Sequence, residues 1–346
     1  MSLLFYDAVT KYTNATEALQ VWDSVGTSMT VSTAFHPYPG QHSVSFNDCD
    51  AVGQMAVVEL GSTFTEIRFG FWRYLKDSNY PHFSVAFTHL NSPQAQVRCI
   101  SGSPQYYLAQ GQYTSGYVYL GSLGVAQSVG SWVWYEFHLG FSTSTGFGHA
   151  RVNGRAAGSV TGVDTLQVST QVGVTQMKFQ GSSNPTKDYY QSIMVWSCEG
   201  TWPADEWIGP QCLTELLPNG DGTHTDFTLS AGSSGWSLID GVTLSTSDYI
   251  SSTSTGNQSS FDVTAYSSIA GGTINAVASE FWGANIGGGS TKLAAGLIDA
   301  STQEYKTAED VGSGRRVAGF FPTRPGSTTA WSSTDLAALE IAVRHG

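Results

Sequence analysis

Residues 132–139 read Trp-Val-Trp-Tyr-Glu-Phe-His-Leu, and this alternation constrains the fold more than any other feature of the chain. In an extended strand, Val133, Tyr135, Phe137 and Leu139 point to one side and the residues between them point to the other. One side is uniformly apolar or aromatic, whereas the other mixes tryptophan with charged residues. The pattern predicts a strand of an antiparallel sheet that turns one face to a packed core.

Short β-rich runs follow one another from the N-terminus to about residue 200, separated by turn residues. Asn153-Gly154 suits the positive φ angles of a two-residue hairpin turn and predicts one there. Near residue 200 the composition changes to a Trp- and Pro-containing stretch. We therefore predict an all-β protein of two packed β-domains: residues 1–200, a junction at 201–212, and a smaller domain at 213–346.

The last segment is the one place where the sequence favours a helix. Ser332 is a candidate N-cap with Asp335 three residues later, and Gly346 follows the end. The apolar residues are spread around much of the helix circumference. The pattern predicts that the second domain ends in a short C-terminal helix.

Charged residues are scarce in this chain of 346 residues. They make up 12% of it, against about 25% in an average soluble domain, and the net charge is −12. An acidic chain without basic runs is not expected to bind nucleic acid, and no apolar run reaches the roughly 20 residues of a membrane span. So few charges favour a protein that covers part of its surface by assembly, and we expect a homo-oligomer.

Four cysteines occur, Cys49, Cys99, Cys198 and Cys212, without a Cys-x-x-Cys pair. This spacing gives no sign of a zinc site. A disulfide between Cys198 and Cys212 remains open beside the simpler expectation of thiols. The N-terminus does not read as a signal peptide, so we expect synthesis in a host cytoplasm.

Several ordered motifs resemble a recurring class of bacteriophage virion proteins. These motifs are Leu3 to Asp7 with Trp22, the aromatic strand with its hairpin, Trp236 to Asp240 with Asp248 to Ile250, and Trp331 to Val343. The resemblance implies that the first domain is a laminin-G or concanavalin A-like lectin sandwich. Relatives often carry paired acidic residues near a possible calcium site where this chain has Gln191 and Ser192.

The resemblance implies a structural component on the outside of a phage or phage-like virion: a tail tip, fibre, head spike or decoration protein. Its partners would be copies of itself, other virion proteins and a host-surface polysaccharide. One alternative is a capsid-stabilising decoration protein that binds no receptor. Another is a polysaccharide-degrading enzyme, but retaining glycosidases on this fold need two carboxyl groups about 5–5.5 Å apart on one strand face. No strand motif supplies that pair, so we expect no enzyme and no catalytic residue.

Aromatic side chains provide the candidate binding surface, because their faces stack on sugar rings and also anchor protein interfaces. Ordinary packing within the core is the leading alternative role for them, ahead of a subunit interface and a glycan contact. The candidates for a glycan or subunit contact are Tyr106, Tyr107, Tyr113, Tyr117, Tyr119, Trp72 and Trp134.

Oxygen ligands alternate in the segment 219–226, at Asn219, Asp221 and Asp226, in a manner resembling part of a calcium loop. The bidentate glutamate that closes such loops is missing. A plain turn opening the second domain is the favoured interpretation, and no cofactor is expected beyond this weak calcium candidate.

Overall fold

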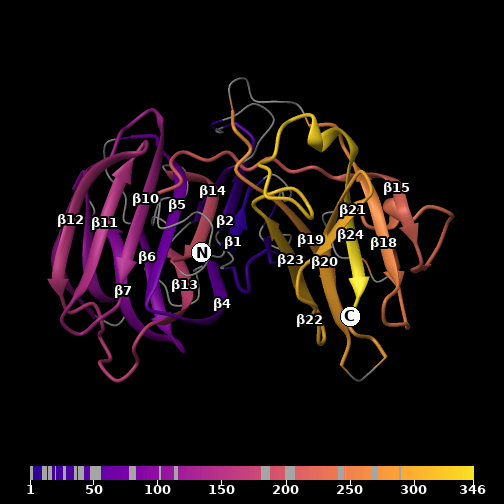
Figure 1. The fold of residues 1–346 in the computed structure, drawn as a ribbon. Coiled ribbons are helices and arrows are strands. Elements are labelled where there is room, and N and C mark those ends of the chain that lie inside the picture. Colours follow the sequence, from indigo (N-terminus) through magenta and orange to yellow (C-terminus); the bar gives the residue numbers. More distant parts are fainter. Residues whose placement is uncertain are drawn as a thin grey trace. The chain divides into compact units, whose positions relative to one another are not determined.

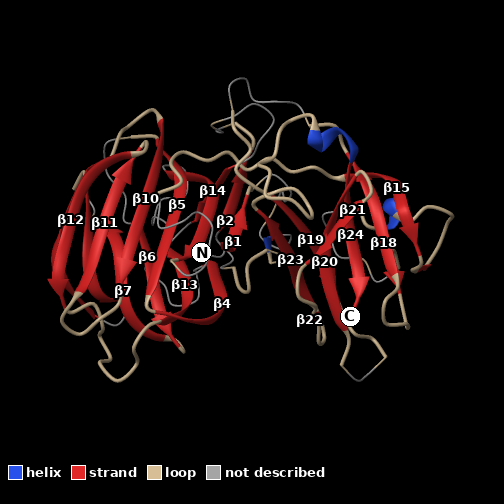
Figure 2. Ribbon diagram, in the orientation of Figure 1, coloured by secondary structure: helices blue, strands red, loops and turns tan. Residues whose placement is uncertain are grey.

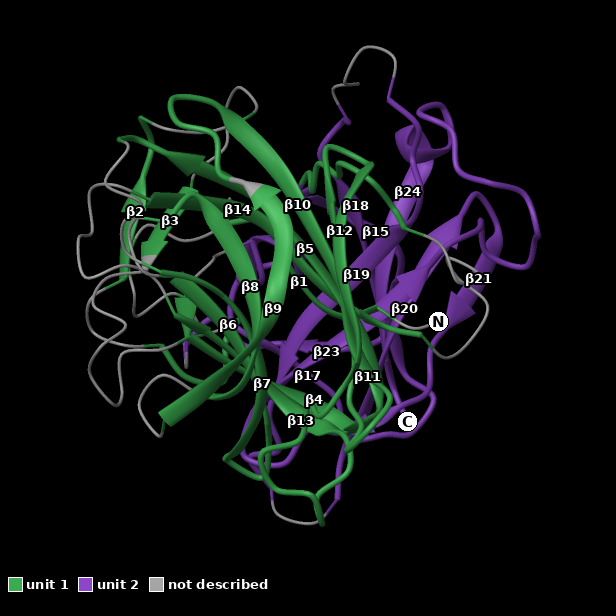
Figure 3. Ribbon diagram, turned by 90° about the vertical axis from the view of Figure 1, so that its left-hand side faces the viewer, with its two compact units in different colours: residues 1–214 green, residues 215–346 purple. Residues whose placement is uncertain are grey.

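The structure is a computed structural model. It describes residues 3–9, 14, 18–19, 21–25, 29–34, 37, 43–46, 56–77, 83–100, 103–112, 116–180, 188–198, 207–240, 245, 247–266, 272–287 and 290–346. The chain forms two compact units, residues 1–214 and 215–346, which Figure 3 shows in two colours.

Nearly all the regular structure consists of β-strands, as Figure 2 shows. The ladders between strands are antiparallel, which confirms the predicted all-β class. Among the described residues, none of the helices has the length and hydrophobicity needed to cross a bilayer.

The first unit is a sandwich of two sheets (Figure 1). One sheet has eight strands in the order β12-β11-β10-β5-β14-β3-β2, with β1 also paired to β14. Its strands are β1 (Leu3–Asp7), β2 (Met29–Ser32), β3 (Ser43–Phe46), β5 (Glu66–Leu75), β10 (Trp132–Gly140), β11 (Gly146–Val152), β12 (Arg155–Val163) and β14 (Asp188–Ser197).

The facing sheet has six strands in the order β4-β13-β6-β7-β8-β9. Its strands are β4 (Ala56–Phe64), β6 (Phe83–His89), β7 (Ser92–Cys99), β8 (Gln105–Gln112), β9 (Gly116–Ala126) and β13 (Val174–Gln180). The core of the unit lies between the two sheets and is rich in aromatic rings, such as the packed pair Phe69 and Phe137.

The alternation in β10 has the predicted effect. Val133, Tyr135, Phe137 and Leu139 all lie in the buried core between the sheets. The intervening residues face outward, where the ring of Trp134 lies over Gly70 of β5. A Cβ atom on that glycine would come within 2.5 Å of the indole. The glycine is therefore required by the close approach of the ring.

The predicted hairpin turn is also confirmed. Asn153 and Gly154 have φ angles of 48° and 79°, as a type I′ turn between β11 and β12 requires. The Asn153 side chain adds a hydrogen bond, because its Oδ1 accepts from the Trp134 backbone N–H at 3.0 Å. The turn is thereby tied to the neighbouring strand.

The sandwich is closed at one side, where β9 of one sheet approaches β12 of the other. Glycines permit this approach: a Cβ on Gly158 would meet the Leu123 carbonyl oxygen at 2.3 Å, and one on Gly121 would meet Val160 at 2.7 Å. Two edges that would otherwise be exposed therefore shield each other.

The second unit is a smaller two-layer β structure. A six-stranded sheet has the order β15-β18-β24-β20-β21, with β22 paired to β20, and the pair β19–β23 packs on it. Its elements are β15 (Pro218–Thr225), β16 (Thr228–Leu229), η2 (Trp236–Leu238), β17 (Ile250–Ser251), β18 (Gln258–Val263), β19 (Val277–Gly283), β20 (Lys292–Asp299), β21 (Thr302–Tyr305), β22 (Glu309–Asp310), β23 (Arg315–Phe321), η3 (Asp335–Ala338) and β24 (Leu339–His345).

The predicted C-terminal helix is wrong. Only one short 3₁₀ turn, η3, forms, and its N-cap is Thr334, without a side-chain capping bond, rather than the predicted Ser332. The Ser332 N–H and hydroxyl both donate to Asp335 Oδ2. The chain then becomes the strand β24, paired on both sides with β18 and β20. The β-branched residues Ile341 and Val343 favour a strand, and two ladders of backbone hydrogen bonds outweigh the helical pattern.

Candidate functional site

The candidate tyrosines that the structure describes lie on β8 and β9, and strand alternation divides them between two faces. Tyr106 points into the core, is fully buried, and its hydroxyl accepts a hydrogen bond from Arg73 Nη1 at 2.7 Å. It is therefore not a surface residue, which corrects that prediction. Tyr113 lies outside the described residues.

Tyr107, Tyr117 and Tyr119 gather on the outer face of the six-stranded sheet. The rings of Tyr107 and Tyr119 meet edge to face at 5.4 Å, and those of Tyr117 and Tyr119 at 5.1 Å. The Arg98 guanidinium, from β7, lies 3.7 Å from the centre of the Tyr117 ring. We call these four residues the tyrosine surface.

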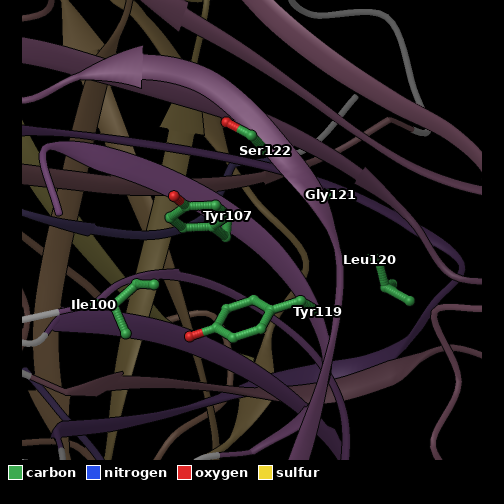
Figure 4. Close-up of a pocket in the computed structure, with 6 residues that line it drawn as sticks. All are labelled: Ile100, Tyr107, Tyr119, Leu120, Gly121 and Ser122. Carbon is green, nitrogen blue, oxygen red and sulfur yellow. The ribbon is translucent and has the colours of Figure 1, made fainter.

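A hollow opens beside these rings, as Figure 4 shows. Tyr107 and Tyr119 lie side by side along it, and 42% of Tyr119 is exposed. The hollow thus presents aromatic faces to solvent. Its lining residues are Ile100, Tyr107, Tyr119, Leu120, Gly121 and Ser122.

Hydrogen-bonding groups surround the hollow. Ser122 Oγ donates to Gln105 Oε1 at 3.0 Å, and the Tyr107 hydroxyl lies 3.3 Å from Ser103 Oγ. Burial, together with the hydrogen bond to Tyr117, raises the pKa of Tyr119 to about 12. The Tyr119 phenol is therefore protonated at neutral pH and can donate as well as accept.

Trp72 and Trp134 do not extend this surface, which corrects the prediction that groups them with the tyrosines. Both lie on the outer face of the opposite, eight-stranded sheet, where Trp134 is fully buried. Trp72 Nε1 donates to the Gln211 carbonyl oxygen at 2.6 Å, so its polar group is already engaged. The two tryptophans help to pack the outer face of their own sheet.

Residues 207–213 cover this tryptophan face, held by Glu136. Its carboxylate accepts the backbone N–H of Ile208 at 2.7 Å and that of Gly209 at 3.1 Å. Burial raises the pKa of Glu136 although these N–H groups lower it. Glu136 is thus an anchor for the segment that leaves the sandwich.

Two of the calcium candidates, Asn219 and Asp221, lie in strand β15 and Asp226 directly follows it, because residues 218–225 form a strand rather than the expected turn. The Asp221 carboxylate already accepts from the Trp236 N–H at 2.8 Å and the Ser234 hydroxyl at 2.9 Å. Asp226 accepts from the Gln258 N–H at 3.0 Å, and Asn219 is an exposed residue of the strand. Both carboxylates therefore serve as local braces of the second unit.

Gln191 and Ser192 occupy a bulge in β14, with Ser192 at a φ of 49°. The Ser192 hydroxyl donates to Gln191 Oε1 at 2.6 Å, and Gln191 Nε2 donates to the Ala8 carbonyl oxygen. An amide and a hydroxyl bonded in this way stabilise the bulge without a cation.

Sequence reasoning missed two polar clusters. Arg73 and Asp188 form a buried ion pair between the sheets, with Nε–Oδ1 at 2.7 Å and Nη2–Oδ2 at 2.6 Å. The second cluster joins Glu66, His138 and Cys198 on the outer face of the eight-stranded sheet. The only signal in the sequence was a charged residue inside an aromatic strand, because each cluster comes from distant segments.

The amino-acid sequence matches no protein-family model and no curated protein. Solved structures with a similar fold include a galectin of Caenorhabditis elegans, which is 12% identical over 44% of this chain and 94% of its own, with a TM-score of 0.29. A carbohydrate-binding module of Bacillus subtilis is 7% identical over 50% of this chain and 98% of its own, with a TM-score of 0.31. A botulinum neurotoxin binding domain, solved with rat synaptotagmin II, is 11% identical over 49% of this chain and 38% of its own, with a TM-score of 0.30. At TM-scores this low, these likenesses carry no argument about this chain.

Proposed function

We propose that the first unit binds a glycan on the tyrosine surface. The observation that carries the proposal is the hollow in which Tyr107 and Tyr119 stand together, with part of Tyr119 open to solvent. An aromatic face packs against the C–H face of a sugar ring, and the hydroxyl and amide groups beside it can bond the sugar hydroxyls. The proposal rests on this surface and not on the solved structures with low TM-scores.

The glycan would be a polysaccharide of a host surface, and we propose that the chain is displayed on the outside of a phage or phage-like virion. Two features support this setting: the ordered motifs that resemble virion proteins, and a composition with few charges. Many copies on one particle would raise a weak single-site affinity by multivalency.

A decoration protein without a receptor is the second candidate. One observation favours it: Tyr119 is 42% exposed, and exposed tyrosine side chains also anchor contacts between proteins. On that alternative, the tyrosine surface would meet another virion subunit, and removing its rings would weaken assembly rather than glycan binding.

The glycan proposal is tested by screening the full chain on an array of bacterial surface polysaccharides and titrating each hit in solution. We expect Tyr119→Ala and Tyr107→Ala to lower the affinity about tenfold or more, which corresponds to the loss of roughly 1.4 kcal/mol. Tyr249→Ala is the matched control, because Tyr249 is 39% exposed in the second unit. Binding that survives both β8–β9 substitutions, or no binding to any glycan, would refute the proposal.

The virion setting is tested by mass spectrometry of particles purified from the source culture. We expect peptides of this chain at a fixed ratio to the major capsid protein, and removal by protease treatment of intact particles. A chain found only in the particle-free fraction would contradict a virion role while leaving the glycan result intact.

A further inference from the structure

Glu66, His138 and Cys198 converge at one end of the outer face of the eight-stranded sheet. Glu66 begins β5, His138 lies on the adjacent β10, and Cys198 directly follows β14 on the other side of β5. His138 Nε2 lies 3.3 Å from Glu66 Oε2 and 3.3 Å from Cys198 Sγ. All three ligand atoms lie within 4.8 Å of one another, and no other described residues form such a trio of His, Cys, Asp or Glu.

We propose that these three side chains bind a zinc ion. Zinc in proteins is tetrahedral, with bonds of about 2.0 Å to nitrogen or oxygen and about 2.3 Å to sulfur. Ligand atoms around such an ion lie roughly 3.3–3.6 Å apart. The two contacts of His138 already have nearly this spacing, so an ion fits with small side-chain shifts.

The contacts of the His138 imidazole favour a metal ligand over a proton relay. In a nucleophile–base–carboxylate triad, the thiol and the carboxylate contact different nitrogens of the imidazole. Here both approach the same atom, Nε2. A single N–H cannot point at two partners at once, whereas a cation between the three atoms engages all of them.

Charge balance is compatible with a dication. A neutral imidazole offers the lone pair of its Nε2 atom to the ion. An ionised Glu66 and the Cys198 thiolate would together neutralise Zn²⁺. The positive charge of Arg68 opposes the ion, and its guanidinium carbon lies 5.6 Å from the centre of the Trp207 ring, whose quadrupole attracts it.

Thiolate and imidazole ligands select zinc over calcium or magnesium, which prefer oxygen. The fourth position would be taken by water. His149, opposite His138 on β11 with its ring 6.0 Å away, is the nearest additional imidazole. The ion would join three neighbouring strands at the point where the chain leaves β14, and so stabilise the first unit.

The test uses the full chain, freed of metal by a chelator, with Co²⁺ as the spectroscopic probe. We expect one equivalent of Co²⁺ to give a thiolate-to-cobalt charge-transfer band that Zn²⁺ abolishes by displacement. Cys198→Ser should lose the band, whereas Cys212→Ser, the matched cysteine control, should keep it. No band in the wild type, or an equal band in Cys198→Ser, would overturn the proposal.

Two further variants separate ligation from folding. Glu66 is about half exposed, so Glu66→Gln should fold normally and yet bind Zn²⁺ at least about tenfold more weakly. Saturating Zn²⁺ should raise the melting temperature of the wild type and of Cys212→Ser, because a ligand that binds only the folded state stabilises it. It should leave Cys198→Ser and His138→Gln unchanged, and an equal rise in all four proteins would contradict a site at these residues.

Discussion

Arg73 is a charged residue in the middle of an aromatic strand, and Asp188 is what allows it to be there. Burial by itself disfavours the charged guanidinium, yet Asp188 and the neighbouring phenols hold the pKa of Arg73 well above its ordinary value. Nη1 donates as well, to the Tyr106 hydroxyl and to Gln127 Oε1 at 2.7 Å each. The pair is a satisfied polar centre within the sandwich core.

Removing one partner of this pair should be costly. We expect Asp188→Asn to lower the free energy of unfolding by about 3–5 kcal/mol, because Arg73 is left as an uncompensated buried charge. Urea unfolding followed by tryptophan fluorescence measures the change. Asp240→Asn, at an exposed position, is the control. If both variants unfold alike, the ion pair does not hold the sandwich.

For single residues, the sequence predicts which side of its sheet a side chain points to better than it predicts which residues that side chain contacts. Alternation in β10 correctly assigned Val133 and its companions to the core. Alternation cannot say which sheet a strand joins, so Trp134 and Tyr107 were grouped although they lie on opposite sheets. Asp7 and Trp22 carry part of the family resemblance, and Trp22 Nε1 donates to Asp7 Oδ2 at 2.8 Å. That contact was not foreseeable from either residue alone.

Among the elements, β24 holds the second unit together through Glu340. Its carboxylate accepts the Thr223 backbone N–H at 2.8 Å, and the hydroxyls of Thr223 and Ser260 at 2.5 Å each. Burial tends to raise the pKa of Glu340, but these hydrogen bonds outweigh it and leave the pKa below its ordinary value of 4.5. The ionised carboxylate therefore links β24, β18 and β15.

This link should make stability depend on pH. A carboxyl group with a lowered pKa in the folded state stabilises the protein above its ordinary pKa, and the contribution is lost as pH falls below that value. We expect the stability advantage of wild type over Glu340→Gln to be full above about pH 5 and to shrink toward pH 3. Thermal unfolding across this range measures it. Glu309→Gln, which alters an exposed pair with Arg315, should show no such trend.

The C-terminal segment shows why element type is hard to predict locally. Residues 331–346 carry a cap motif and apolar residues that a helix can also use, but Ser332 and Asp335 bond to each other and Ser332 does not cap the 3₁₀ turn. The segment becomes a strand because it pairs with β18 on one side and with β20 on the other, in the middle of the sheet. Both neighbouring strands are distant in sequence, so the local pattern of residues 331–346 does not show that a strand is favoured over a helix.

For the whole molecule, the formation of a homo-oligomer stays a prediction. With 12% charged residues and exposed apolar side chains such as Val118 and Ile286, the chain is expected to cover part of its surface with further copies. We expect light scattering of the purified protein to give a molar mass at least about three times 36.9 kDa. A mass of one chain at every concentration tested would contradict a stable oligomer in solution.

The alternation of side chains along β8 also affects which amino-acid substitutions the protein can accept during evolution. Tyr106 and Leu108 face the core, while Tyr107 between them faces the other way. Variation at the outward positions leaves the interior untouched, whereas variation at the inward ones disturbs it. A lineage can therefore exchange one recognised partner for another through single codons at alternate places, while inheriting its architecture unaltered.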